Sequence, residues 1–154
     1  MIKSIEGNFN NTEVYDLLVK HFVELRSVSP EGSTHVLDIN GLKDPSIKFW
    51  SLWENDNLMG CGALKFLDKQ HGEFKSIRVN DKYRNKGNGI KIINHLITKA
   101  KILDIKKLSL ETGAGGFFAP ARKLFHNCKF KVCSPFSHYK HDINSVYMSL
   151  LISN

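Results

Sequence analysis

The chain has 154 residues, of which 42% are hydrophobic, enough for one hydrophobic core. We therefore expect a single domain over residues 1–154. No apolar run approaches the roughly 18 residues of a membrane-spanning helix, and the N-terminus lacks the apolar region of a secretory signal. The 3 cysteines are odd in number, which argues against a disulfide framework. These features predict a cytoplasmic protein that does not enter a membrane.

The formal net charge of +7 at pH 7 indicates an anionic partner without naming it. Much of the excess lies between Lys82 and Lys107, where Asp104 is the single acid. Nucleic acid, a phosphorylated cofactor and the solvated face of a helix each explain such a block. Nucleic acid is the least favoured of the three, because the chain has no interleaved aromatic and basic stripe and no evident recognition helix.

Hydrophobic periodicity predicts the elements in chain order, beginning with a short strand at residues 2–6. Asn10, with Glu13 three residues later, is typical of a helix N-cap with its reciprocal partner, so a helix is expected over 11–27. Period-two alternation and turn residues then predict further strands. The expected strands are 47–54, 58–67, 72–79, 107–112, 130–133 and 146–152, and the expected further helices lie near 37–42, after Gly89 and from Pro120.

This order of elements predicts an α+β sandwich with helices on both faces of a twisted sheet. The turn Arg84-x-x-Gly87-x-Gly89 stands between a strand and a long helix. Glycines let the backbone approach a ligand closely, and the free N–H groups of a helix start attract a phosphate. By the motif alone, an ordinary strand-to-helix turn is an equally good explanation. A Rossmann unit is excluded, because a third glycine is missing and the turn does not follow the first strand.

Gly72–Gly89 resembles motif A of the GNAT acyltransferases, whose signature is (Gln/Arg)-x-x-Gly-x-(Gly/Ala). Further blocks in the same order are similar to small bacterial YsnE-like acetyltransferases. These blocks are Phe49–Trp53, Gly60–Lys65, Leu108–Gly113 and Phe118–Arg122. The resemblance covers nearly the whole chain and implies the GNAT acyl-CoA N-acyltransferase fold, with a mixed, mostly antiparallel sheet.

The resemblance also implies acetyl-CoA as co-substrate, bound in a cleft where the fourth and fifth strands splay apart. Main-chain groups at Ile77 and Val79 would hold the pantetheine arm as an added pseudo-strand. The turn would take the pyrophosphate, with Phe125 packed against the pantetheine. The expected cofactor contacts are Ile77, Arg78, Val79, Arg84, Asn85, Lys86, Gly87, Asn88, Gly89 and Phe125.

The implied reaction is direct attack by a primary amine, carried by a small molecule or by a protein, within a ternary complex. A base must first deprotonate the ammonium. Glu73 is the first candidate and Glu111, across the cleft, the second, and each has an ion-paired structural role as its alternative. Strand alternation predicts that Glu73 and Lys75 share one face with Ile77 and Val79.

The position expected to hold the general acid, which would protonate the leaving thiolate, departs from the family pattern. Many GNAT enzymes carry Asn-x-x-Ala-x-x-x-Tyr, whose tyrosine lies near the CoA sulfur, whereas this chain has Phe118-x-x-Ala121-x-x-x-Phe125. Tyr139 is a substitute candidate, although a structural tyrosine explains it better. The loss of the tyrosine motivates a second function, a non-catalytic acyl-CoA-binding module.

No metal is expected, because His138-x-x-His141 has no third ligand spaced to join it. The acceptor amine is not identified by the sequence. Its specificity is expected to lie in residues 27–44 and 134–144. The oligomeric state is open, with a homodimer suggested only by the frequency of dimers among relatives.

Overall fold

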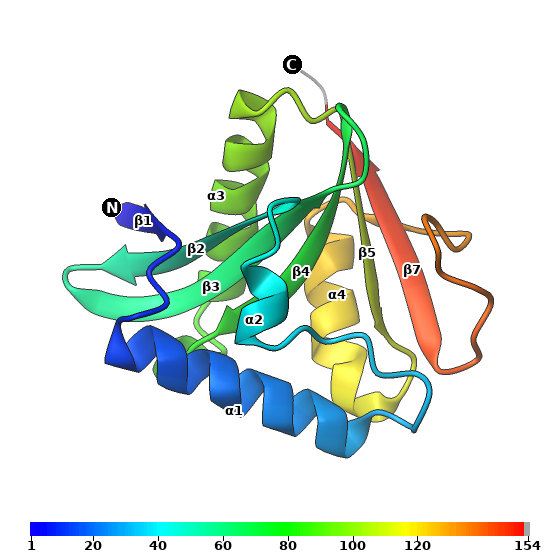
Figure 1. Cartoon of the computed structure of the whole chain (residues 1–154), viewed down its shortest axis with the longest axis horizontal. Helices are drawn as coiled ribbons and strands as arrows, with labels where there is room; N and C mark the ends of the chain where they lie inside the picture. The colour runs from blue at the N-terminus through cyan, green and yellow to red at the C-terminus, as the bar shows by residue number, and fades with distance from the viewer. Residues whose placement is uncertain (153–154) are drawn as a thin grey trace.

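A computed structural model describes residues 1–152, which form one seven-stranded sheet in the order β1-β2-β3-β4-β5-β7-β6 (Figure 1). The strands are β1 Ile2–Glu6, β2 Ile47–Glu54, β3 Asn57–Phe66, β4 His71–Val79, β5 Lys107–Gly113, β6 Lys131–Cys133 and β7 Ser145–Leu151. β4 and β5 are parallel, and the other neighbouring pairs in this part of the chain are antiparallel. The predicted mixed, mostly antiparallel sheet is confirmed.

Helices cover both faces of the sheet, as predicted. The helices are α1 Thr12–Val28, α2 Ile39–Leu42, α3 Asn88–Ile102 and α4 Ala119–Asn127. The larger core lies between the sheet and α3 with α4, and includes Leu96, Phe74 and Phe130. A smaller core lies under α1 and α2 and includes Val14 and Leu42. Each helix buries one apolar stripe, so the sheet is shielded from water on both sides.

The start of α1 differs from the prediction by one residue. Asn11, not Asn10, is the N-cap, and its side chain accepts a hydrogen bond from the Val14 amide at 3.1 Å. Glu13 therefore stands one position too early for the reciprocal bond of a capping box. It still places a negative charge in the first turn, where the helix dipole favours it.

A bulge in β4 overturns the predicted face assignment. Cys61 pairs with Arg78 and Ala63 with Lys75, so β4 has one residue more than β3 across this step, and Ser76 takes the left-handed φ of 53°. The extra residue reverses the alternation. Ile77 and Val79 consequently pack against the α3–α4 core, on the face opposite Glu73 and Lys75.

The parallel strands β4 and β5 stay together only at their start. Their paired residues are His71 with Lys107, Gly72 with Leu108 and Glu73 with Ser109. Beyond that point β4 follows β3 as far as Val79, while β5 follows β7 as far as Gly113. The two strands therefore diverge, which Figure 1 shows as a wedge between β4 and β5.

Gly60→Ala should destabilise the protein. A Cβ at Gly60 would lie 2.2 Å from the Arg78 carbonyl oxygen, a backbone atom of β4 that cannot move aside cheaply. We expect a loss of roughly 1–3 kcal/mol in the free energy of unfolding, measured by urea denaturation. Gly115→Ala is the control, because its Cβ would meet no atom within 4 Å. Equal stability of the two variants would contradict the close β3–β4 approach.

Candidate active site

A cleft of about 580 Å³ opens where β4 and β5 diverge. Its walls come from both strands, the C-terminal half of α1, residues 35–37, the turn before α3, and α4. The splay leaves the β4 main chain beyond Glu73 without a β5 partner. Such an unpaired strand edge can accept an extended ligand by hydrogen bonding.

The turn before α3 has the geometry of an anion site. Gly87 is the N-cap of α3 with a left-handed φ of 77°, and no side chain caps the first turn. The amide groups of this turn therefore have no side-chain acceptor, and the positive end of the helix dipole lies beside them. Arg84, Asn85, Gly87 and Gly89 line the cleft.

Two predicted cofactor residues in this turn are not among those lining the cleft: Lys86 and Asn88. Asn88 is buried, and its side chain donates a hydrogen bond to the Tyr83 carbonyl oxygen at 3.0 Å. It therefore fixes the shape of the turn. Gly89 serves packing, because a Cβ there would come within 2.7 Å of the Leu124 side chain on α4.

The other predicted cofactor residues line the cleft: Ile77, Arg78, Val79 and Phe125. Phe125 is largely buried and packs edge-on against Phe130. The Arg78 side chain turns toward α1, where Nη1 lies 3.0 Å from Glu24 Oε1. The Arg78 side chain therefore forms an ion pair on the α1 face of the sheet.

Glu73 is the centre of a buried polar cluster. Its Oε2 accepts a hydrogen bond from the Tyr139 hydroxyl at 2.6 Å and one from Lys75 Nζ at 3.3 Å. Lys75 Nζ also donates to the Tyr139 oxygen at 3.1 Å. Burial, and then the nearby Glu73 charge, raise the pKa of Tyr139, so its phenol keeps its proton. Glu73 is only 1% exposed, and its Oε1 has no hydrogen-bond partner.

Glu111 on β5 faces the same cleft from the opposite strand. Its Oε2 accepts a hydrogen bond from the Ser145 hydroxyl at 2.9 Å. Burial raises the pKa of Glu111 to about 7, although the Ser145 hydrogen bond acts against this rise. The carboxyl group therefore changes its protonation state near neutral pH, where a general base is most effective.

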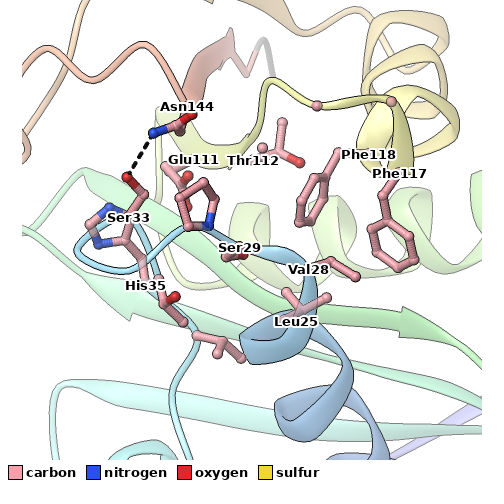
Figure 2. Close-up of a pocket in the computed structure, with 16 residues that line it drawn as sticks. Leu25, Val28, Ser29, Ser33, His35, Glu111, Thr112, Phe117, Phe118 and Asn144 are labelled. Atoms are coloured by element: carbon pink, nitrogen blue, oxygen red, sulfur yellow. Dashed lines mark hydrogen bonds between the residues drawn. The ribbon is translucent and has the colours of Figure 1, made fainter.

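A second pocket of about 280 Å³ joins the cleft at Glu111, and the two share His35 and Phe117 (Figure 2). It is closed by residues 28–36 and by Asn144. These lie in or beside the two segments in which the sequence placed acceptor specificity. The individual side chains were not predicted, because irregular segments have no periodicity from which to infer their direction.

Comparison with known proteins identifies the family. Residues 11–130 match the sequence model of the acetyltransferase (GNAT) family. The chain belongs to this family. It is 43% identical over 137 residues to the uncharacterized N-acetyltransferase YsnE of Bacillus subtilis (strain 168), covering 89% of this chain and 91% of that protein. It is 37% identical over 139 residues to the uncharacterized N-acetyltransferase YedL of Escherichia coli (strain K12), covering 90% and 87%.

A solved GNAT-type structure supports the fold. The crystal structure of a Bacillus subtilis acetyltransferase in complex with CoA superposes with a TM-score of 0.73. The match covers 99% of this chain and 100% of that one, at 20% sequence identity. The GNAT fold expected from the resemblance is thus confirmed.

Neither a membrane helix nor a metal cluster is found in the described residues. Within 1–152, no helix is long and apolar enough to cross a bilayer. The same residues contain no group of three or more His, Cys, Asp or Glu side chains placed to hold a metal ion. His138 instead stacks on the ring of Tyr139, with ring centroids 4.8 Å apart.

Ile90→Glu should separate CoA binding from stability. Ile90 lines the cleft in the first turn of α3 and is partly exposed. A carboxylate there suits the helix dipole, which typically adds about 0.3–1 kcal/mol, but repels a pyrophosphate. We expect an unchanged or higher melting temperature and a CoA affinity lower by on the order of tenfold. Calorimetry and thermal shift measure both, with Ile90→Gln as the uncharged control. Equal CoA affinities of the two variants would place the phosphates elsewhere.

Proposed function

We propose that the protein transfers the acetyl group of acetyl-CoA to a primary amine, with both substrates bound together. The observation that carries this proposal is the placement of Glu73 on β4 and Glu111 on β5, on the two strands that diverge to form the cleft. Two carboxyl groups then face the space between these strands, where an incoming ammonium would bind. The names of YsnE and YedL, both N-acetyltransferases, support the same reaction class.

The cleft fits acetyl-CoA by three features of this chain. The uncapped start of α3 and Arg84 suit the phosphates. The free edge of β4 at Ile77 and Val79 suits the amide-bearing pantetheine arm. Phe125 supplies an apolar wall. When bound, acetyl-CoA supplies an acetyl group activated as a thioester.

We assign the role of general base to Glu111 in preference to Glu73, reversing the order suggested by the sequence. Glu111 has one hydrogen bond, from Ser145, and a pKa raised to about 7 by burial. Glu73 already accepts hydrogen bonds from Tyr139 and Lys75 on one oxygen. Its proposed role is structural: with Tyr139 and Lys75 it fixes the wall of the cleft on the β4 side.

Tyr139 is proposed to position Glu73 and not to protonate the leaving thiolate. Its hydroxyl proton is directed at Glu73 Oε2, and burial raises its pKa. Phe125 has no proton to give. A thiol has a pKa of about 8.5, so thiolate is a good leaving group without a dedicated acid.

The pH dependence tests the assignment of the base. Glu111 must be ionised to accept a proton, and its pKa is raised to about 7. kcat/KM of the native enzyme should therefore rise with pH through about 7, as followed by thiol release between pH 5.5 and 9. Glu111→Gln should lower kcat/KM by about 10²–10⁴-fold and remove this rise.

Glu73→Gln is the companion variant and should keep the rise near pH 7 at a reduced rate. If instead Glu73→Gln removes the rise while Glu111→Gln preserves it, the two roles are interchanged. An intact CoA-induced thermal shift in both variants shows that the cofactor site is unaffected.

Tyr139→Phe tests the positioning role. The change keeps the ring contacts but removes the hydroxyl hydrogen bond to Glu73. We expect less than about a tenfold loss of kcat, with the pH profile retained, because Lys75 still holds Glu73. A loss beyond about 10²-fold, reversed in the double variant with Phe125→Tyr, would show that Tyr139 protonates the thiolate.

A non-catalytic acyl-CoA-binding module is the second candidate function. Phe125, largely buried at the cleft wall, favours it, because the family's usual acid is replaced there by a packing residue. The two candidates differ in thiol release: a binding module shows a CoA-induced thermal shift but no release with any amine.

A further inference from the structure

The pocket beside Glu111 has two chemically different walls, shown in Figure 2. One wall is apolar and is formed by Leu25 and Val28 of α1 with Phe117 and Phe118. Phe117 and Phe118 contact edge-to-face, with centroids 5.1 Å apart. Flat aromatic surfaces of this kind bind aromatic or other apolar groups.

The opposite wall is polar, and its hydrogen bonds hold the pocket in shape. The Ser33 hydroxyl donates to Asp142 Oδ2 at 2.6 Å. Asn144 Nδ2 in turn donates to the Ser33 oxygen at 3.3 Å, the bond drawn in Figure 2. These bonds tie the segment after α1 to the segment before β7. The wall is thus preorganised, which lowers the entropic cost of binding a small ligand.

The charges around the pocket favour a cation and not a carboxylate. The residues that line it include Glu111 but no Lys or Arg in the described part of the chain. Burial and Lys75 lower the pKa of His35, so this imidazole is neutral at pH 7. In the adjoining cleft, Lys75 is paired with Glu73, and Arg78 with Glu24.

The third cation that lines the cleft is Arg84, in the turn before α3. Its Nε lies 3.3 Å from Asp81 Oδ1. Each of the three is therefore already matched by an acid of this chain. An acceptor carboxylate placed next to Glu111 would meet like charge. The Arg122 guanidinium near this pocket is engaged by the Gly113 and Gly115 carbonyl oxygens, at 2.7 and 2.8 Å, and Arg122 is not among the residues that line the pocket.

We infer that the acceptor is a small primary amine carried on an aromatic or similarly flat apolar group and lacking a carboxylate, the class of the arylalkylamines. This inference rests on the proposed acetyl transfer. The apolar group lies against Phe117, Phe118 and Val28, and the ammonium lies beside Glu111. At about 280 Å³, the pocket is near the lower end of the roughly 300–1,000 Å³ typical of ligand sites, so the acceptor carries one or two rings.

The chemical step balances with these groups. Glu111 takes one proton from the ammonium and later passes it to water. The neutral nitrogen forms the C–N bond to the acetyl carbon, and the C–S bond breaks with its electron pair on sulfur. The nitrogen loses its second proton to water, and the departing thiolate takes up one proton from solution, so that one proton is released overall. The products are an N-acetyl amide and a free thiol.

Matched pairs of acceptors test the inference. Phenethylamine and phenylalanine differ only by a carboxylate, as do tryptamine and tryptophan, while putrescine lacks the aromatic group. We expect kcat/KM, measured by thiol release, to be at least about tenfold higher for each decarboxylated amine than for its amino acid or for putrescine. An amino acid or putrescine used as well as or better than the aryl amines would overturn the inference while leaving acetyl transfer intact. CoA binding without thiol release from any amine would overturn the proposed function itself.

Val28→Arg tests the location of the acceptor. Val28 is 38% exposed, lines this pocket and lies in the last turn of α1, where a cation suits the helix dipole. The added guanidinium should raise the preference for phenylalanine over phenethylamine by about tenfold, with an unchanged CoA-induced thermal shift. Val23→Arg is the matched control on α1, since Val23 is 60% exposed and lines neither cavity. A preference that changes equally in both variants, or in neither, would place the acceptor outside this pocket.

Discussion

The divergence of β4 from β5 is the constraint on which the site depends. The two strands share three residue pairs, and each then continues with its other neighbour, β4 with β3 and β5 with β7. Beyond Glu73, the β4 main chain has no strand partner on the β5 side among the described residues. Buried main-chain N–H and C=O groups need a hydrogen-bond partner. An extended, amide-bearing ligand can provide it. The same divergence places Glu73 and Glu111 on strands that face each other across open space.

The bulge at Ser76 decides which face of the sheet each later side chain of β4 occupies. Before the bulge, Glu73 and Lys75 point toward Tyr139. After it, Ile77 and Val79 turn toward the α3–α4 core, and Arg78 turns toward α1. If β4 alternated regularly through Ser76, Arg78 would instead point into the apolar core. The left-handed φ of 53° at Ser76 is a local cost that the β3 pairing on either side maintains.

The two carboxylates illustrate how environment separates two groups of the same type. Glu73 is almost fully buried, and one of its oxygens accepts hydrogen bonds from the Tyr139 phenol and the Lys75 ammonium. Glu111 is less enclosed, accepts a hydrogen bond from the Ser145 hydroxyl, and has its pKa raised to about 7 by burial. Burial without a charged partner favours the neutral form of Glu111. The two carboxyl groups of the cleft therefore lie in different surroundings, one engaged by two donors and the other titrating near neutral pH.

The sequence by itself determined the order of the strands and α-helices and placed most of their bounds to within one or two residues, because 3.6- and 2-residue periodicities are local properties. It also predicted the turn before α3, where Gly87 adopts a left-handed φ of 77° that glycine tolerates without strain. Only the tertiary structure decided which face each β4 residue occupies, because one extra residue reverses every later side chain and leaves no trace in composition. The tertiary structure also brings His35, Glu111 and Asn144, which are far apart in the chain, into the lining of one pocket. Such contacts depend on how the sheet brings distant strands and loops together, which no local pattern records.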